Sequence, residues 1–312
     1  MGSTAVVRIG ARGSRLSRAQ VEEVRLLLLG AWPGITVEVE IFVTTGDIQL
    51  ETPLPLMGGK GVFTSEIETA LREGRIDFAV HSLKDLPVAN PDGIVIGAVP
   101  ERASVADVLV SRSGRGFHEL SPNPVIGTSS YRRAAQLQSA RSDSRTESIR
   151  GNVETRLRKA MDPDGPYDAI VLAKAGLERL GLLDVITEEL PLDLMLPAPG
   201  QAALAVQCRD DADSIVLAAA LDHLPTRLAV EAERAFLSGL GGGCSAPVAS
   251  YGELHNGQLT LRGRVLALDG QHVIDVQSGT GCGDVDSAQE AGRSLAATAL
   301  QQGAGVLVEV AR

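Results

Sequence analysis

Cys244 is the residue whose setting most clearly suggests chemistry. It lies in the segment Gly241–Pro247 (GGGCSAP), where three glycines precede the thiol. Glycine permits close approach and backbone dihedral angles that other residues avoid, so this thiol could be presented to a bulky group. The alternative is a packed, unreactive cysteine, because free cysteines are usually buried.

Arginines concentrate where helices are expected to begin. Three such junctions are Arg12–Ser14, Thr128–Arg133 and Arg150–Arg156. Helix N-termini expose unpaired N–H groups that receive anions, and arginine can bind a carboxylate through two parallel hydrogen bonds. Together the three junctions suit a ligand with several carboxylates. For any single arginine, a solvated helix face or a surface ion pair remains the alternative.

Asp85 follows Lys84 at the end of a predicted buried strand, Ile76–Val80. Ligands of α/β proteins bind at strand ends, which makes this carboxylate a candidate for catalysis. An ordinary turn residue is the alternative. The segment Gly58–Gly61 could hold a phosphate or form a flap, but it lacks the Walker pattern.

Composition limits the class of protein. The 312 residues include 29 basic and 39 acidic side chains, for a net charge of −10, whereas general nucleic-acid binders are more often basic. The chain is 44% hydrophobic and 22% charged, as in soluble globular proteins. No apolar run has membrane-spanning length, and the N-terminus lacks an export signal. We therefore expect a cytoplasmic protein with no membrane or nucleic-acid partner.

Cysteine and histidine spacing argues against a metal enzyme. Cys208, Cys244 and Cys282 are odd in number and contain no C-x-x-C pair, and the five histidines are scattered. Neither a disulfide framework nor a structural zinc site fits this pattern, so we expect no metal.

The first 110 residues alternate between strand and helix patterns. Predicted strands are Val6–Ile9, Ile35–Val43 and Ile76–Val80, and predicted helices are Ser14–Leu29 and Glu66–Arg72. This alternation predicts an α/β layer with largely parallel strands.

A second α/β set follows from Arg102. Its predicted elements are the strands Asp107–Val110, Val125–Gly127 and Ala169–Ala173 and the helices Tyr131–Ser139 and Ala175–Leu180. The segment Leu196–Gly200 then resembles a hinge rather than a strand.

Beyond Arg209 the pattern changes to a smaller α+β part. A predicted helix, Arg227–Leu237, precedes three predicted antiparallel strands and a covering helix: Val248–Leu254, Gln258–Ala267, His272–Gln277 and Ala288–Gln301. Asp269-Gly270 is expected to form the hairpin turn between the last two strands.

Taken in order, these segments resemble the porphobilinogen deaminase (hydroxymethylbilane synthase) family through most of the chain. The matching motifs are Arg12–Ser14 with Gln20, Thr45–Asp47, Gly58–Gly61, Ala79–Pro87, Gly127–Ser130 with Arg132-Arg133, Arg150–Val153 with Thr155-Arg156, Tyr167–Ile170, Ala175–Leu177, Pro199–Gln201 and Gly242–Cys244. No single motif is decisive, but this many in order is highly specific.

The resemblance implies a fold of two periplasmic-binding-protein-like α/β domains and a third, smaller α+β domain. The expected first domain is residues 1–101 completed by 199–219, and the second is 102–198. The third, 220–312, would carry the cofactor cysteine.

The resemblance also implies a transferase of tetrapyrrole biosynthesis. Such an enzyme joins four porphobilinogen molecules head to tail with loss of ammonia at each step. The chain grows from a dipyrromethane cofactor held by a thioether, here to Cys244, and is then released by hydrolysis as hydroxymethylbilane. We expect a monomer whose product passes to uroporphyrinogen-III synthase.

Site residues carried over from the family fall into three groups. Asp85 is the expected catalytic carboxylate, where an anion would stabilise the azafulvene-type cation left by ammonia loss and shuttle protons. Cofactor-binding residues are expected at Cys244, Ser82, Lys84, Thr128, Ser129, Arg132, Arg133 and Gly151. Substrate-binding residues are expected at Arg12, Ser14, Lys60, Arg150, Arg156 and Arg179. The cations suit pyrroles that each carry an acetate and a propionate, because burying those carboxylates unpaired would be prohibitive.

Three positions depart from the family pattern. Ala202 stands where glycine usually follows Pro-Gly-Gln, Leu56 stands where some members have lysine, and Tyr131 replaces a more usual leucine. Two other functions stay open on the residues alone. One is a non-catalytic binding or sensory protein for a polycarboxylate, and the other is a nucleotide-dependent enzyme using Gly58–Gly61.

Overall fold

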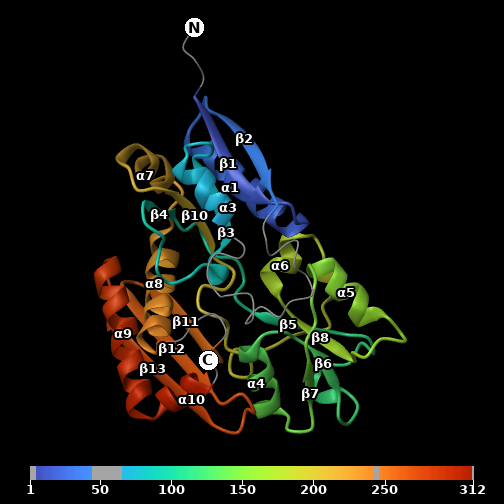
Figure 1. The fold of residues 1–312 in the computed structure, drawn as a ribbon. Helices are drawn as coiled ribbons and strands as arrows, with labels where there is room; N and C mark the ends of the chain where they lie inside the picture. Colours follow the sequence, from blue (N-terminus) through green and yellow to red (C-terminus); the bar gives the residue numbers. More distant parts are fainter. Residues whose placement is uncertain (1–4, 44–64, 242–245, 311–312) are drawn as a thin grey trace. The chain divides into compact units, whose positions relative to one another are not determined.

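The computed structural model describes residues 5–43, 65–241 and 246–310 (Figure 1). Lys60, Leu56 and Cys244 lie outside this part of the chain. The chain forms two compact units: Met1–Arg102 with Ala203–Arg227, and Ala103–Ala202 with Leu228–Arg312.

The first unit is built on a five-stranded mixed sheet. Its strand order is β2-β1-β3-β10-β4. These strands are β1 (Val6–Arg12), β2 (Thr36–Phe42), β3 (Phe78–Ser82), β4 (Ile94–Ala98) and β10 (Leu204–Arg209). β1 runs parallel to β2 and β3, whereas β10 runs antiparallel to β3 and β4. The parallel β1 and β3 therefore end at the same edge of the sheet.

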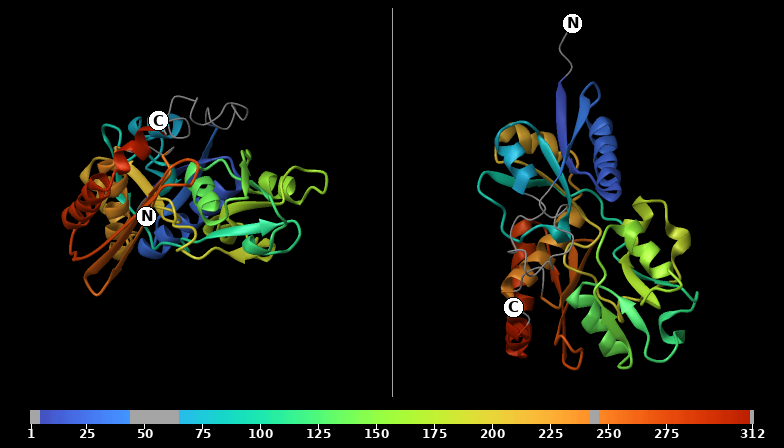
Figure 2. Two further views of the ribbon diagram at one scale, coloured as in Figure 1. Left: turned by 90° about the horizontal axis from the view of Figure 1, so that it is seen from below. Right: turned by 45° about the vertical axis from the view of Figure 1, so that its right-hand side comes forward.

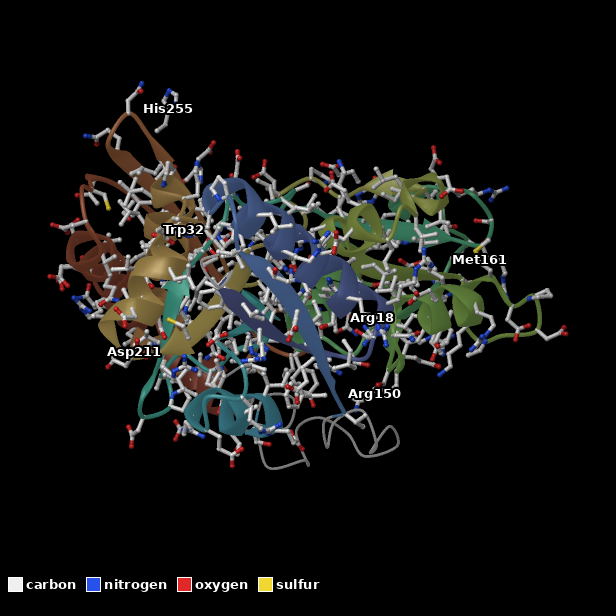
Figure 3. All side chains as sticks on the ribbon, turned by 90° about the horizontal axis from the view of Figure 1, so that it is seen from above. Arg18, Trp32, Arg150, Met161, Asp211 and His255 are labelled. Carbon is white, nitrogen blue, oxygen red and sulfur yellow. The ribbon has the colours of Figure 1, made fainter. Side chains whose placement is uncertain are left out.

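Helices cover both faces of this sheet. α1 (Arg15–Ala31) and α7 (Ala212–Ala219) contribute Val21, Val24, Leu28 and Ala218 to the core on one face. α3 (Ser65–Arg72) packs Ile67, Ala70 and Leu71 against the other. Near the end of α1, the indole Nε1 of Trp32 donates to the Leu217 carbonyl of α7 at 3.2 Å (Figure 3). The edge of the sheet is thereby left for the loops that follow β1 and β3.

The second unit contains a similar five-stranded sheet, in the order β7-β6-β8-β5-β9. These strands are β5 (Asp107–Ser111), β6 (Val125–Gly127), β7 (Arg145–Glu147), β8 (Ala169–Ala173) and β9 (Glu188–Glu189). α4 (Tyr131–Ala140) packs on one face through Leu137. α5 (Val153–Met161) and α6 (Lys174–Arg179) cover the other through Ala160 and Leu177.

An antiparallel three-stranded sheet completes the second unit. It consists of β11 (Val248–His255), β12 (Gln258–Leu266) and β13 (Val273–Gly281), and His255 lies at the tip of its first hairpin (Figure 3). Figures 1 and 2 show α9 (Val285–Gln301) lying along this sheet with α8 (Leu224–Gly239) beside it. The short α10 (Ala304–Val310) follows. Gly263 of β12 is closely approached by Phe236 of α8, which a side chain at Gly263 would displace.

The predicted class, two α/β sheets and a smaller α+β part, is confirmed. The strands predicted in the first 110 residues are parallel as expected, because β1 pairs in parallel with β2 and β3. The later strand β10 makes this sheet mixed, since it runs antiparallel to β3 and β4. In the second sheet β5 likewise runs antiparallel to β8 and β9. Leu196–Gly200 forms no strand, and Gly270 adopts a left-handed φ of 70° in the expected hairpin turn. The division into three domains stays a prediction.

Within residues 5–43, 65–241 and 246–310, no helix combines the length and apolarity needed to cross a membrane.

Candidate active site

A cavity of about 90 Å³ lies in the first unit, where β1 and β3 end. Seven of the residues that line it are polar: Arg12, Ser14, Ser17, Gln20, His81, Ser82 and Asp85. Four of these, Arg12, Ser14, Ser82 and Asp85, belong to the residues that the sequence singled out. The first unit therefore gathers a cation, a carboxylate and three hydroxyls around one small space.

Local hydrogen bonds position the Arg12–Ser14 side of this cavity. Ser14 is the N-cap of α1, and its hydroxyl accepts from the Ser17 backbone N–H at 3.2 Å. The Ser17 hydroxyl in turn accepts from the Arg12 backbone N–H at 3.2 Å. This pair of bonds satisfies one helix-terminal N–H group, that of Ser17, and joins the end of β1 to the first turn of α1. It fixes the turn between β1 and α1, and with it the point from which the Arg12 side chain leaves the backbone.

The Asp85 side of the cavity is tied to the same helix. Gln20 of α1 is buried, and its side-chain amide donates to the Ser82 hydroxyl at 2.7 Å. Lys84 and Asp85 follow directly in the short 3-10 helix Leu83–Asp85. The Leu83 backbone N–H donates to the Ala203 carbonyl at 3.0 Å, which anchors this turn on the chain that enters β10.

His81 is the buried titratable group of the cavity. It is 7% exposed, and its Nε2 has no hydrogen-bond partner among the described residues. Burial lowers the pKa of His81 to about 4, and the positive charge of Arg12 acts in the same direction. His81 is therefore neutral at neutral pH and adds no second cation beside Arg12.

In the second unit, the start of α4 holds the next group of predicted residues. Ser130 is the N-cap and accepts from the Arg133 backbone N–H. The Ser129 hydroxyl donates to the Ile149 carbonyl at 2.8 Å, and the Thr128 hydroxyl accepts from the Ser130 backbone N–H at 3.2 Å. These bonds hold the loop between β6 and α4 against the segment after β7.

Arg132 and Arg133 are buried and share one carboxylate, that of Asp107. The Arg132 Nη2 lies 2.7 Å from one oxygen of Asp107, and the Arg133 Nη2 lies 2.6 Å from the other. Gln201 donates to the same carboxylate at 3.0 Å. Burial lowers the pKa of Arg132, despite the opposing charge of Asp107. The sequence reasoning placed these arginines at a binding site but missed Asp107.

The third arginine junction surrounds the start of α5 and includes Arg150 (Figure 3). Asn152 caps this helix by accepting from the Thr155 backbone N–H at 2.9 Å. The Arg156 Nε donates to the Gly151 carbonyl at 2.8 Å. Gly151 has a φ of 117°, and an added Cβ would lie 2.7 Å from the Thr155 side chain, so this turn requires glycine.

Arg179, at the end of α6, lies at the segment predicted to be a hinge. Its Nη2 donates to the carbonyl of Ala202 at 3.1 Å. Each unit thus groups several of the predicted site residues: Arg12, Ser14, Ser82, Lys84 and Asp85 in the first, and Thr128, Ser129, Arg132, Arg133, Arg150, Gly151, Arg156 and Arg179 in the second. Cys244 and Lys60 lie outside the described residues.

The sequence reasoning did not assign His81 and Asp107 to the site. Their positions in the sequence could have identified both as candidates. Asp107 opens β5 directly before three buried apolar residues, and His81 follows three buried apolar residues of β3. A charged or titratable side chain in such a position needs a partner or a shifted pKa, so it can be recognised as a candidate. Within the described ranges, no cluster of three or more histidine, cysteine, aspartate or glutamate side chains could hold a metal ion.

Comparison with known proteins gives two family-model matches. The model "Porphobilinogen deaminase, dipyromethane cofactor binding domain" matches residues 7–217, and the model "Porphobilinogen deaminase, C-terminal domain" matches residues 227–301.

Curated relatives match along nearly their whole length. The porphobilinogen deaminase of Syntrophomonas wolfei subsp. wolfei is 46% identical over 303 residues, which is 97% of each chain. That of Desulforudis audaxviator is 45% identical over 303 residues, covering 97% of this chain and 96% of the relative.

Solved structures give a much weaker likeness. The ligand-binding component of an ABC-type import system from Staphylococcus aureus with zinc bound is 15% identical, with a TM-score of 0.39. The likeness covers 76% of this chain and 74% of that one.

Proposed function

The chain belongs to the porphobilinogen deaminase family, and we propose that Asp85 is its catalytic carboxylate and Cys244 its point of cofactor attachment. The activity is that of a porphobilinogen deaminase (hydroxymethylbilane synthase), a transferase of tetrapyrrole biosynthesis. The residues matched by the first family model form a dipyrromethane cofactor binding domain.

The buried cations of the second unit support the fit of such a cofactor. Two guanidinium groups, Arg132 and Arg133, share the carboxylate of Asp107, and the buried Arg132 Nε has no hydrogen-bond partner in the described part of the chain. A ligand that carries carboxylates suits such a donor set. When bound, the dipyrromethane supplies the pyrrole to which substrate units are added.

Asp85 is the one carboxylate among the residues lining the cavity of the first unit, and this observation carries the catalytic assignment. Positive charge develops on the substrate pyrrole as ammonia leaves. A fixed anion beside that pyrrole stabilises the charge, because it is oriented before the reaction begins. Asp85 also offers a carboxylate oxygen to receive and return the pyrrole N–H proton.

The other predicted site residues are assigned to substrate or cofactor binding in each unit. In the first unit, Arg12 and Ser14 would hold the carboxylates of porphobilinogen, while Ser82 and Lys84 would hold the cofactor. In the second, Thr128, Ser129, Arg132, Arg133 and Gly151 would hold the cofactor, and Arg150, Arg156 and Arg179 would bind substrate. Lys60 would add a further cation for the substrate.

Partners and location complete the proposal. Porphobilinogen is the substrate that the family implies. We propose that the protein works as a cytoplasmic monomer and that uroporphyrinogen-III synthase consumes its product.

Intact-mass and turnover measurements on three proteins test the proposal. We expect freshly purified wild-type protein to carry a covalent adduct that peptide mapping locates at Cys244. Asp85→Ala should keep the adduct and lose nearly all turnover of porphobilinogen, and Cys244→Ser should lack the adduct.

Each assignment fails on a different result. Turnover at the wild-type rate in Asp85→Ala would remove Asp85 from the mechanism, and an adduct mapped elsewhere would remove Cys244. A binding protein without chemistry predicts an unmodified wild-type chain and no turnover.

A further inference from the structure

Asp107 lies at the centre of a buried hydrogen-bond cluster with Arg132, Arg133 and Gln201. Its side chain has no exposure to solvent, and both oxygens accept hydrogen bonds. One accepts from the Arg133 Nη2 at 2.6 Å and Nε at 3.2 Å and from the Gln201 amide at 3.0 Å. The other accepts from the Arg132 Nη2 at 2.7 Å. The carboxylate thus fixes two arginines that leave consecutive positions of α4.

Asp107 is a charged residue at the start of an apolar stretch. The next residues of β5, Val108–Val110, are buried and apolar, and they pack into the cores on both faces of the sheet. An unpaired carboxylate in such a strand would carry a large desolvation cost. Its retention there is therefore explained by the groups that it binds.

Each arginine is held at further points. The Arg132 Nη1 donates to the Leu196 carbonyl at 2.6 Å, and the Arg133 Nη1 donates to the Val171 carbonyl at 3.2 Å. Gln201 is braced in turn, because its amide also donates to the Val105 carbonyl at 2.8 Å. The guanidinium planes are therefore set by the protein and do not depend on a ligand for their orientation.

The charges of these three side chains do not cancel. Two guanidinium groups, at least 91% buried, form their ion pairs with one carboxylate among the described residues. Burial lowers the pKa of Arg132, and its buried Nε finds no hydrogen-bond partner within residues 5–43, 65–241 and 246–310. One further anion would balance the trio, whereas a second protein carboxylate would repel a carboxylate ligand.

We propose that Asp107, braced by Gln201, is a positioning residue for Arg132 and Arg133, holding them so that one carboxylate of the dipyrromethane completes the cluster. The inference rests on the proposed cofactor-binding role of the two arginines. Asp107 acts through them and is not itself a ligand contact. Its oxygens are already engaged by protein donors.

The test compares Asp107→Asn and Gln201→Leu with Asp222→Asn in the full-length protein. Asp222 provides a matched control, because its carboxylate accepts from the Val99 backbone N–H and from Arg227, and all three residues belong to the first unit. The readouts are the ratio of adduct-bearing to unmodified chains by intact mass and the midpoint of thermal unfolding.

We expect Asp107→Asn to lower this ratio about tenfold, as suits loss of hydrogen bonds to charged groups. Gln201→Leu removes only the brace and leaves every charge in place, so we expect about a threefold loss with a small change in the unfolding midpoint. Asp222→Asn should lower the midpoint and leave the ratio unchanged. If Asp107→Asn does not fold, Gln201→Leu decides the question alone.

Normal loading of both Asp107→Asn and Gln201→Leu would overturn this inference and leave the proposed function intact. Loss of loading in all three variants, in proportion to their unfolding midpoints, would overturn it as well, because it would reduce Asp107 to a purely structural role. A wild-type chain without an adduct would overturn the proposed function and this inference together.

Discussion

Buried ionisable side chains differ between the two units in whether they have a partner of opposite charge. Arg132 and Arg133 are each paired with the Asp107 carboxylate, at 2.7 and 2.6 Å. His81 forms no ion pair with a carboxylate among the residues that the structure describes, and burial lowers its pKa to about 4, so it is neutral at neutral pH. Both outcomes follow from the free-energy cost of removing an ion from water. An oppositely charged partner offsets this cost, and an imidazole without such a partner avoids it by staying neutral.

The pKa of His81 predicts a component of acid destabilisation. An unfolded histidine titrates near pH 6.5, while His81 in the folded protein titrates near 4. Between these values only the unfolded chain takes up the proton. The free energy of unfolding therefore falls as the pH falls from 6.5 to 4, by on the order of 3 kcal/mol.

Urea denaturation across this pH range can isolate that component. We expect His81→Gln to lose less stability between pH 6.5 and 4 than the wild-type protein. His255→Gln is the control, since His255 is exposed at a hairpin tip. Parallel pH profiles for His81→Gln and the wild type would contradict the assignment.

Residue identities at the site were predictable from motifs, but their partners were not. Asp85, Arg12 and Ser82 were named from the sequence, and the structure brings them to one cavity. The pairing of Arg132 and Arg133 with Asp107 joins residues 25 and 26 positions apart. Such a contact depends on how α4 packs on β5, which periodicity does not encode.

At the scale of elements, the segment Leu196–Ala202 is held by hydrogen bonds to several parts of the second unit. The Leu196 backbone is bound by Gln136 at both its N–H and its carbonyl. The Gly200 backbone N–H donates to the buried carboxylate of Glu233 at 2.6 Å. The Ala202 carbonyl accepts from Arg179. The segment predicted as a hinge is therefore fixed at several points before it enters β10.

Ala202 is strained within this segment. Its φ is 70°, and of the described non-glycine residues with positive φ it alone is not asparagine. The left-handed region costs an L-residue roughly 1–2 kcal/mol, which glycine avoids. Since glycine also makes the unfolded chain more flexible, we expect Ala202→Gly to stabilise the protein by up to about 1 kcal/mol.

The neighbouring Ala203→Gly is the matched control, because Ala203 is buried and lacks a positive φ. It should destabilise the protein by roughly 0.5–1 kcal/mol. Urea unfolding of both variants checks the prediction. Equal losses of stability in the two would show that Ala202 carries no strain.

Elements with strong local signals were the predictable ones. α1 begins after Ser14 and α5 after Asn152, as their capping residues indicate. β10 and β4 were missed, and so was the antiparallel direction of β10. β10 lies 122 residues after β3 in the chain (82 to 204), and nothing local to Leu204–Arg209 indicates which strand it pairs with or in which direction.

At the scale of the whole molecule, the two units are linked where the chain passes between residues 102 and 103, 202 and 203, and 227 and 228. α8 begins in the first unit and continues into the second. A defect in the packing of α8 is therefore placed to affect the stability of both units.

Gly292 of α9 lies in close contact with α8. A Cβ at this position would lie 2.2 Å from the Ala232 carbonyl oxygen and 2.7 Å from the Ala235 Cβ, atoms that cannot move independently of the helix. We expect Gly292→Ala to force the helices apart and to destabilise the second unit by about 1–3 kcal/mol, the range typical of overpacked cores. This outweighs the gain in helix propensity from alanine, which is at most about 1 kcal/mol.

Gly30→Ala is the same type of substitution, but we expect it to change stability in the opposite direction. Gly30 also lies within a helix, α1, but its added Cβ would meet no atom within 4 Å. It should therefore stabilise the first unit by up to about 1 kcal/mol. Calorimetric unfolding of the two variants beside the wild type separates packing from propensity. A Gly292→Ala protein as stable as Gly30→Ala would mean that α8 and α9 are not in the close contact described.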